Sequence, residues 1–428
     1  MFNKAALLVA LTLAISIVAS PASAPALANT SARGITIPLR KKGVLTRANG
    51  VFDKDKAIVD AVLAHNKHRQ NLINLAKNRG HSALPTGAVI QPLATIPRAI
   101  QRQMKKRQAE VLIDQGETEW TGAISIGTPA QNFQIDFDTG SADLWVVSSD
   151  CTGSACSSHS KFSTSSSSTA REESGSFSIQ YGDKSTVISV AGVEVKGQFF
   201  SPVNTLSSSF AQDPADGILG LAFPAISNLN QPPFFDAAHD QGAIEANQFG
   251  FFLAGSGSEL YLGGVDASKF TGDIEYHGVD TSTGFWEITG GSVKVGSSLP
   301  LLGIGSVKNI EAIIDSGTTI MYGPPSAVGE IYAQVPGAAL FDAQNGYYLF
   351  PCESPPQIAF NWGGADWVIS AENINLGTTT AGSSDCVGAL AAKDFGLGST
   401  FVLGDSFMKN SYVVFDADRN AVGFAALA

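Results

Sequence analysis

The chain has 428 residues, of which 44% are hydrophobic, 15% are charged and 44 are glycine. This length can form two or more domain-sized cores, and the composition excludes a disordered chain and a helical bundle. The formal net charge of −11 is divided unevenly, because residues 1–107 hold 17 Lys/Arg against 3 Asp/Glu and residues 108–428 hold 10 against 35. A body this acidic repels phosphates, so nucleic acid is excluded as a partner.

The N-terminus has the features of a secretory signal peptide. Lys4 gives a basic start, and the apolar run Ala5–Val18 is too short to span a bilayer comfortably. The sequence Ala22-Ser23-Ala24 is a small-residue cleavage site, with Ala26-Leu27-Ala28 as the alternative. We therefore predict a signal peptide over residues 1–24 and a secreted, extracellular protein without a membrane partner. An uncleaved anchor is the other interpretation, which the small residues disfavour.

Residues 25–107 are interpreted as a basic inhibitory propeptide. Apolar residues recur at helical spacing from Asp53 to Lys77 among basic side chains, which predicts a helix. A basic segment ahead of an acidic body favours docking over an acidic site, with Lys77 facing that site. A basic surface helix without a partner is the simpler alternative. The dibasic pair Lys106-Arg107 marks the expected propeptide cleavage site, and the propeptide is one expected partner.

Two short runs, 177 residues apart, carry most of the chemical information. Asp138 ends an apolar stretch and is followed by Thr139-Gly140-Ser141, and Asp315 is followed in the same way by Ser316-Gly317-Thr318. One such run is weak evidence, because it is often an ordinary turn. Two runs in matched settings indicate a duplicated unit whose carboxylates face each other.

From about residue 119, short apolar runs alternate with Gly, Pro, Asn and Ser, which predicts strands and turns. Short helices are expected near Pro233–Gln241 and Ser326–Gln334. A further apolar segment with Gly follows each Asp run, at Asp216–Leu221 and at Phe401–Asp405. The repeat is too long for a solenoid, so it predicts two related lobes, residues 108–290 and 291–428.

A pair of carboxylates in one site suits the hydrolysis of peptide bonds. Two carboxyl groups about 3 Å apart cannot both ionise easily, so the pair holds one proton over a wide pH range. The ionised group takes a proton from water, and the protonated group donates to the scissile carbonyl. This chemistry needs no metal, cofactor or covalent nucleophile. We therefore expect an acid endopeptidase that acts on peptide and protein substrates.

The body resembles the pepsin-like aspartic proteases, a family of secreted endopeptidases, and looks most similar to the fungal members. Phe137–Val147 and Ala312–Pro324 match the two active-site signatures, and Ile179–Ser185 resembles the flap over the cleft. The resemblance covers roughly residues 119–428. It implies a mainly β, bilobal fold with the active-site cleft between two related β lobes. The shared-proton mechanism is the one known for the pepsin dyad, so the resemblance supplies it.

The resemblance also assigns roles to individual residues. Asp138 and Asp315 would be the catalytic dyad. The residues that support the dyad would be Thr139, Gly140, Ser141, Ser316, Gly317 and Thr318. The flap and substrate-binding residues would be Tyr181, Gly182, Asp183, Trp145 and Thr319. Without the family, Trp145 is equally well explained as an ordinary core aromatic.

Four cysteines in a secreted chain favour two disulfides, and three pairings are open. Cys151 and Cys156 are close enough for a local loop, and the family's two common disulfides would join Cys151 to Cys156 and Cys352 to Cys386. A zinc site is disfavoured, because the cysteines lack partners at zinc spacing.

The chain departs from the family pattern near the predicted site. Ala142-Asp143 stands where Ser-Asn is usual, which adds a charge near the dyad. Lys184 stands where Gly is frequent, and Ser185–Val190 shortens the flap. We interpret these changes as changes of specificity. A catalytically inactive homologue that binds proteins is the alternative function, which the two intact Asp residues disfavour. We expect the enzyme to be a monomer.

Overall fold

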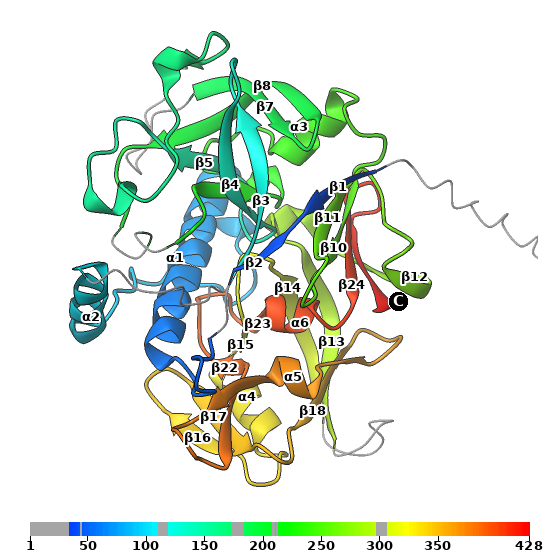
Figure 1. Ribbon diagram of the computed structural model, residues 1–428. Coiled ribbons are helices and arrows are strands. Elements are labelled where there is room, and N and C mark those ends of the chain that lie inside the picture. Colours follow the sequence, from blue (N-terminus) through cyan, green and yellow to red (C-terminus); the bar gives the residue numbers. More distant parts are fainter. Residues whose placement is uncertain are drawn as a thin grey trace, which may run out of the picture. The chain divides into compact units, whose positions relative to one another are not determined.

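The computed structural model describes residues 34–42, 45–109, 119–172, 184–207, 210, 213–296 and 306–428. These residues are mostly β-structure, in four sheets (Figure 1). The predicted signal peptide and the flap residues Tyr181, Gly182 and Asp183 lie outside the described residues.

The first lobe is built on an eight-stranded sheet. Its strands, in spatial order, are β2 (Arg40–Lys42), β3 (Glu119–Ile126), β4 (Gln131–Asp138), β9 (Gly217–Gly220), β5 (Leu144–Val147), β8 (Val193–Val203), β7 (Lys184–Val190) and β6 (Arg171–Glu172). Side chains alternate along a strand, so Phe133, Ile135 and Phe137 of β4 enter the core. The opposite face of β4 carries Asp136 and Asp138.

The second lobe is built on a seven-stranded sheet. Its strands, in spatial order, are β19 (Trp367–Val368), β18 (Gln357–Asn361), β13 (Glu287–Gly296), β14 (Ser306–Ile314), β23 (Thr400–Leu403), β15 (Met321–Gly323) and β22 (Leu390–Ala392). The strand that leads to Asp315, β14, runs parallel to β23, and β23 is antiparallel to β15. In the first lobe β4, β9 and β5 have the same arrangement. The lobes thus repeat one three-strand unit, and the fold is mainly β and bilobal, as predicted.

Two further sheets complete the β-structure. The six-stranded sheet has the order β1 (Ile35–Pro38), β11 (Glu259–Leu262), β10 (Gln248–Phe252), β24 (Tyr412–Asp416), β25 (Ala421–Leu427) and β12 (Phe270–Gly278). The four-stranded sheet has the order β16 (Ala339–Asp342), β17 (Tyr347–Pro351), β21 (Asp385–Gly388) and β20 (Asn375–Thr378). The residue-290 boundary drawn from the sequence falls inside β13.

Short helices connect the strands. They are α3 (Phe234–Asp240), α4 (Pro325–Tyr332), α5 (Ala371–Ile374) and α6 (Asp405–Met408), with 3-10 turns at His81–Ala83, Ser154–Cys156, Thr164–Ser166, Pro224–Ile226 and Thr281–Thr283. The first two confirm the helices expected near Pro233–Gln241 and Ser326–Gln334.

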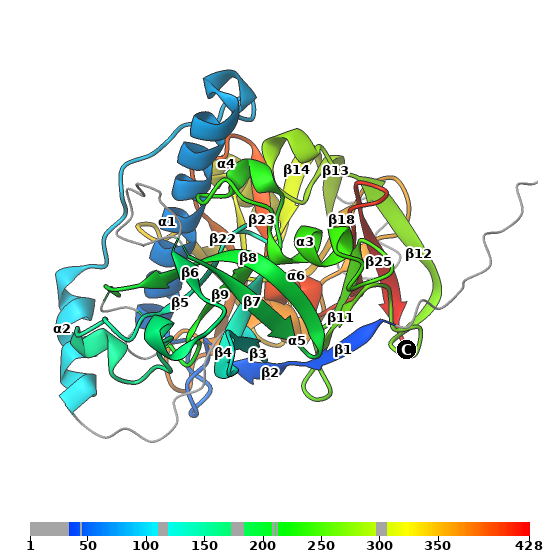
Figure 2. The ribbon, with the colours of Figure 1, turned by 90° about the horizontal axis from the view of Figure 1, so that it is seen from above.

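The N-terminal segment, residues 34–109, contains the longest helix in the described chain. Helix α1 (Lys54–Arg79) begins after Asp53, whose carboxylate accepts a hydrogen bond from Lys56 N, and stops at Gly80, whose φ of 90° a side chain disfavours. It confirms the helix predicted from Asp53 to Lys77. A second helix, α2 (Arg98–Ala109), follows, and in Figures 1 and 2 it lies on the outer side of α1.

The two strands at the start of this N-terminal segment, β1 and β2, are joined to the body by main-chain pairing. Strand β1 pairs with β11, and β2 pairs with β3, so each extends a sheet of the body as an edge strand. Residues Ile37 and Leu39 are buried in the core they share with Phe137. The segment therefore contributes apolar area to the main core as well as a helix.

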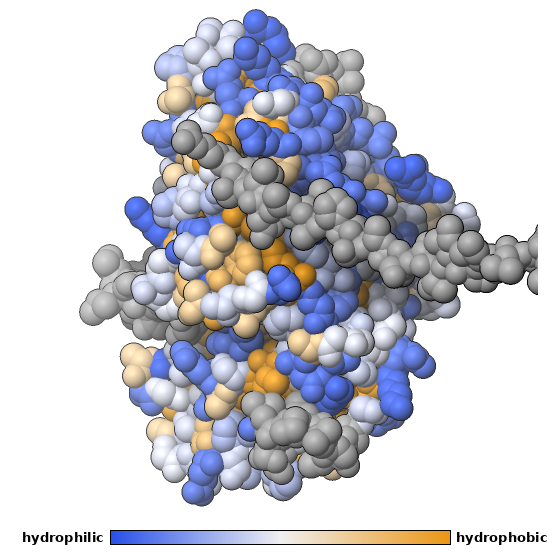
Figure 3. Space-filling model, turned by 90° about the vertical axis from the view of Figure 1, so that its right-hand side faces the viewer, coloured by the Kyte–Doolittle hydropathy of each residue, from blue (hydrophilic) through white to orange (hydrophobic). Residues whose placement is uncertain are grey.

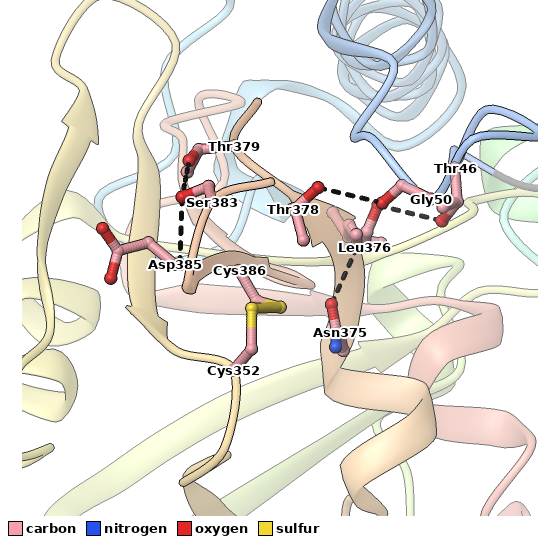
Figure 4. Close-up of a disulfide and its surroundings, with 11 residues drawn as sticks. Thr46, Gly50, Cys352, Asn375, Leu376, Thr378, Thr379, Ser383, Asp385 and Cys386 are labelled. Atoms are coloured by element: carbon pink, nitrogen blue, oxygen red, sulfur yellow. Dashed lines mark hydrogen bonds between the residues drawn. A yellow bond between two sulfur atoms is a disulfide. The ribbon is translucent and has the colours of Figure 1, made fainter. Parts of the chain in front are cut away.

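A loop ahead of α1 is fixed beside one of the two disulfides (Figure 4). Thr46 Oγ1 donates to Leu376 O at 2.9 Å, and Thr378 N donates to Gly50 O at 2.9 Å, so the loop continues the edge of β20. The neighbouring strand β21 carries Cys386, which is bonded to Cys352. The other disulfide joins Cys151 to Cys156. These are the pairs that the family resemblance implies.

Hydrophilic side chains cover much of the face in Figure 3, and apolar ones gather near its middle. Among the described residues, no helix is long and apolar enough to cross a membrane.

Candidate active site

Asp138 and Asp315 are positioned by equivalent strands of the two lobes. Asp138 ends β4 and Asp315 follows β14, and their side chains are 1% and 0% exposed. Each carboxylate accepts one hydrogen bond from the backbone N–H two residues later and one from the hydroxyl three residues later. The distances are 2.8 Å from Gly140 N and 2.6 Å from Ser141 Oγ to Asp138, and 3.0 Å from Gly317 N and 2.6 Å from Thr318 Oγ1 to Asp315. The two sites are therefore near copies.

Thr139 and Ser316 tie the two sites together through four reciprocal hydrogen bonds. Thr139 N donates to Ser316 Oγ at 3.0 Å, and Ser316 N donates to Thr139 Oγ1 at 2.9 Å. Each hydroxyl then donates across the interface, Thr139 Oγ1 to Ile314 O at 2.9 Å and Ser316 Oγ to Phe137 O at 2.6 Å. All four bonds are buried, so they fix the separation of the carboxylates with little freedom.

The glycine in each run permits the close approach of the opposite carboxylate. A Cβ atom on Gly140 would collide with the carboxylate of Asp315, and a Cβ atom on Gly317 would collide with that of Asp138. The predicted supporting residues of both runs thus lie together at the dyad.

Lys67 of helix α1 lies between the two carboxylates. Its Nζ donates to Asp138 Oδ1 at 3.0 Å, to Asp315 Oδ1 at 2.9 Å and to Gly317 O at 3.1 Å. Burial alone would lower the pKa of Lys67, but the two carboxylates outweigh it and raise the pKa above its usual range. Lys67 therefore stays charged in this position.

The same contacts separate the two carboxyl groups electrostatically. Burial raises the pKa of Asp138, and the charge of Asp315 adds to this effect, although Lys67 opposes it. Burial would also raise the pKa of Asp315, but Lys67 and His68 outweigh it and hold the pKa below its usual range. The His68 ring is fully buried, with Nε2 3.2 Å from Asp315 Oδ2. Asp315 is thus the more acidic member of the pair while α1 is in place.

The prediction that Lys77 faces the acidic site is wrong. Lys77 is ten residues beyond Lys67 on the same helix, which corresponds to about 15 Å along the axis. Sequence reasoning missed Lys67 because several lysines share the helix and their pattern does not fix its rotation or depth. The sequence itself offers no pattern that separates Lys67 from the other lysines of α1.

Amide side chains of α1 hold the helix along the same wall of the cleft. Asn71 Nδ2 donates to Gly140 O at 2.7 Å, Asn74 Nδ2 to Ile226 O at 3.0 Å, and Asn78 Nδ2 to Ser227 O at 2.7 Å. Asn71 and Asn74 are buried. A buried amide that lost its hydrogen-bond partner would cost free energy, so these bonds help to keep α1 docked. The buried side of α1 therefore combines these amides with apolar side chains such as Leu72 and Leu75, which are fully buried in the main core.

A cavity of about 330 Å³ remains beside α1 and is lined by residues of both lobes. Trp145, Asp136 and Thr319 line it, and the Trp145 ring meets Phe210 edge to face at 5.3 Å between centroids. Two of these, Trp145 and Thr319, are predicted substrate-binding residues. Asp136 was not predicted, although its position two residues before Asp138 places both on one face of β4.

The structure also locates Asp143 and the dibasic pair Lys106-Arg107, which the sequence singles out. Asp143 accepts hydrogen bonds from Ser227 Oγ and Asn228 N, each at 2.7 Å, so its carboxylate is bonded into the loop after Ile226. The pair Lys106-Arg107 lies near the end of helix α2, and its side chains are outside the described part of the structure.

Comparison with known proteins agrees with this geometry. A family model described as eukaryotic aspartyl protease matches residues 119–427. The chain is 36% identical to an aspartic protease of Phaffia rhodozyma, over 95% of this chain and 94% of that one. It is 37% identical to endothiapepsin of Cryphonectria parasitica, over 73% and 76% of the two chains, and 35% identical to pepsin A of Sus scrofa, over 73% and 82%. The chain therefore belongs to the pepsin-like eukaryotic aspartyl proteases, which are aspartic-type endopeptidases.

Proposed function

We propose that this protein is the secreted zymogen of an acid endopeptidase, with Asp138 and Asp315 as its catalytic dyad. In this proposal residues 1–24 are the signal peptide and residues 25–107 the inhibitory propeptide. The single observation that carries it is the position of Lys67 Nζ, at hydrogen-bond distance from both carboxylates. An attacking water must contact both groups, so the ammonium group occupies its place.

The proposed reaction needs the dyad in a form with one proton. Once Lys67 leaves, two neighbouring carboxyl groups share a proton, because two charges at this distance repel strongly. One group then activates water, and the other donates a proton to the carbonyl of a substrate peptide. Ser141 and Thr318 hold the outer oxygen of each carboxylate, which keeps the inner oxygens directed at the reacting atoms.

The lowered pKa of Asp315 supports opening in acid. Lys67 holds the pKa of Asp315 below its usual range in the closed form. A depressed carboxyl pKa stabilises the closed form at higher pH, and this contribution is lost as the pH falls through the depressed value. Protonation of the acidic body weakens its attraction for the basic N-terminal segment at the same time.

The decisive experiment is to incubate the full-length chain with an unfolded protein substrate at pH 7 and at pH 3.5. We expect no cleavage at pH 7, and cleavage at pH 3.5 together with loss of mass from the N-terminus. Pepstatin, an inhibitor of aspartic proteases, should block both events. Equal activity at the two pH values with the N-terminal segment intact would contradict the inhibitory role.

The raised pKa of Asp236 predicts that this residue makes the fold more stable at acidic pH than at neutral pH. It lies in the first turn of α3, where burial and the charge of Asp240 raise its pKa to about 6. A raised carboxyl pKa gives stability that is present below the unfolded value near 4 and is lost as the pH rises to 6. We expect Asp236→Asn to raise the free energy of unfolding by about 1–3 kcal/mol at pH 7 and by almost nothing at pH 3.5.

Urea unfolding at both pH values, in an Asp138→Asn background that prevents self-digestion, measures this difference. Asp240→Asn is the matched control on the same helix, and it should give a smaller gain because it removes only the neighbouring charge. An equal gain from Asp236→Asn at both pH values would show that proton binding is not the cause.

A further inference from the structure

Residues Val89–Ile96, here called the strap, connect the 3-10 turn after α1 to helix α2. The strap has no helix and no strand. It holds two of the three large apolar side chains that are strongly exposed among the described residues, Val89 at 60% and Leu93 at 63%. The third is Leu340, at 50%. A protease cleft that takes apolar side chains into pockets could bind these two without first exposing them.

The strap is fastened to α1 by side chains. Arg69 Nε donates to Gln91 O at 2.7 Å, and His65 Nε2 lies 3.1 Å from Pro92 O. Asn66 binds both backbone groups of Ala94, accepting from its N–H at 2.9 Å and donating to its carbonyl at 3.0 Å. These bonds hold the strap backbone against α1 and leave the Leu93 side chain in solvent.

The strap lies on the side of α1 that faces away from the dyad. Successive residues of a helix are about 100° apart, so Arg69 is about 200° around the axis from Lys67. A cavity of about 470 Å³, lined by Gln91 and Ala94 among others, separates part of the strap from the second lobe. The strap is thus accessible from outside and only partly packed against the body.

The rest of the N-terminal segment is a poorer protease substrate. A cleft of this kind binds an extended chain through its backbone, with apolar side chains in pockets. Helix α1 is buried in the cleft, and β1 is paired in a sheet. Helix α2, which contains Lys106-Arg107, must unfold over several residues before it can be bound as an extended chain.

We propose that the first cut of activation falls in the strap, at the Leu93–Ala94 bond, and that a second, already active copy of this chain makes it. The same molecule cannot make this cut while α1 fills its cleft and Lys67 occupies its dyad. One water is consumed: the C–N bond breaks, the hydroxyl goes to the carbonyl carbon of Leu93, and the proton goes to the nitrogen of Ala94. The cut separates α1 from α2, so only non-covalent contacts then retain the inhibitory helix. This inference rests on the proposed zymogen function.

The test uses the full chain with Asp138→Asn as an inert substrate and a trace of active enzyme at pH 3.5. Intact mass and N-terminal sequencing at early times identify the first cut. We expect a new N-terminus at Ala94 before any cut appears after Arg107. Leu93→Asp in the same inert chain should slow the first cut at least tenfold, because an acidic side chain replaces the apolar one that enters the pocket.

Two matched variants make the test specific. Leu340→Asp changes the exposed leucine of the second lobe that lines the cavity next to Ala94, and it should leave the first cut unchanged because Leu340 is not part of the bound chain. Lys106→Gln with Arg107→Gln should also leave the first cut unchanged, although it removes the dibasic pair. Asn66→Ala should speed the first cut severalfold, because it frees both backbone groups of Ala94.

The outcomes separate this inference from the proposed function. A first cut inside α2, or an unchanged rate with Leu93→Asp, overturns the strap as the site even when an added unfolded protein is digested. If neither the inert chain nor the unfolded protein is digested, both the inference and the proposed function fail. In the unchanged chain at pH 3.5, a first cut at Leu93–Ala94 whose half-time does not shorten as the protein concentration is raised overturns the role of a second copy.

Discussion

Lys67→Met is expected to make the full-length chain activate at a higher pH and much faster than the unchanged chain. Removing one partner of a buried ion pair leaves the other charge without compensation, at a cost of about 3–5 kcal/mol to the closed form. Here two carboxylates lose their common cation, because Lys67 contacts both Asp138 and Asp315. We expect the pH midpoint of activation to rise by at least one unit, and activation at pH 6 to become at least tenfold faster.

The measurement is the rate at which activity towards a peptide substrate appears after the pH of the purified chain is lowered in steps. Lys77→Met is the matched control, since it removes the same charge from the same helix away from the dyad. Its activation should stay within a fraction of a pH unit of the unchanged chain. If the two variants behave alike, the overall charge of the helix controls activation and the contact of Lys67 with the dyad does not.

The geometry of the dyad could be predicted because each Asp run carries its own partners. The residues two and three positions after each Asp supply its hydrogen bonds, and the first hydroxyl of each run makes the bonds between the lobes. All of this is encoded in four consecutive residues, and a duplication makes it visible. The strand pattern similarly predicted a mainly β, two-lobed fold.

The position of α1 could not be predicted in the same way. Lys67 contacts residues 71 and 248 positions away, and those contacts depend on the rotation and depth of a helix docked between lobes. The buried side of α1 carries apolar residues such as Leu72 and Leu75 beside Asn71 and Asn74, so a hydrophobic pattern indicates that this side docks but does not show which lysine reaches the dyad. Asp143 is a similar case, since a loop 84 residues later binds its carboxylate.

The contacts of α1 combine two kinds of inhibition. Lys67 neutralises the carboxylates that perform the chemistry, and the amides of Asn71, Asn74 and Asn78 bind carbonyls along the cleft wall. The first kind depends on pH and the second does not. Acid therefore removes the charge contribution while the amide bonds persist, which explains why a cut that detaches α1 would complete activation.

Asp138→Asn and Asp315→Asn are each expected to reduce peptide hydrolysis by the mature enzyme at least about a thousandfold, and the double variant should be no less active than either. An amide can neither hold the shared proton nor accept one from water, so the pair fails as a unit when one member is replaced.

The matched control is Asp136→Asn. Asp136 is a buried aspartate on the same face of β4 as Asp138. It lines the cavity beside α1 with Trp145, so we expect its replacement to change the KM for substrates more than kcat. Steady-state kinetics of the four variants and the unchanged enzyme decides this, and a kcat in either single dyad variant within tenfold of the unchanged enzyme would remove that residue from the catalytic pair.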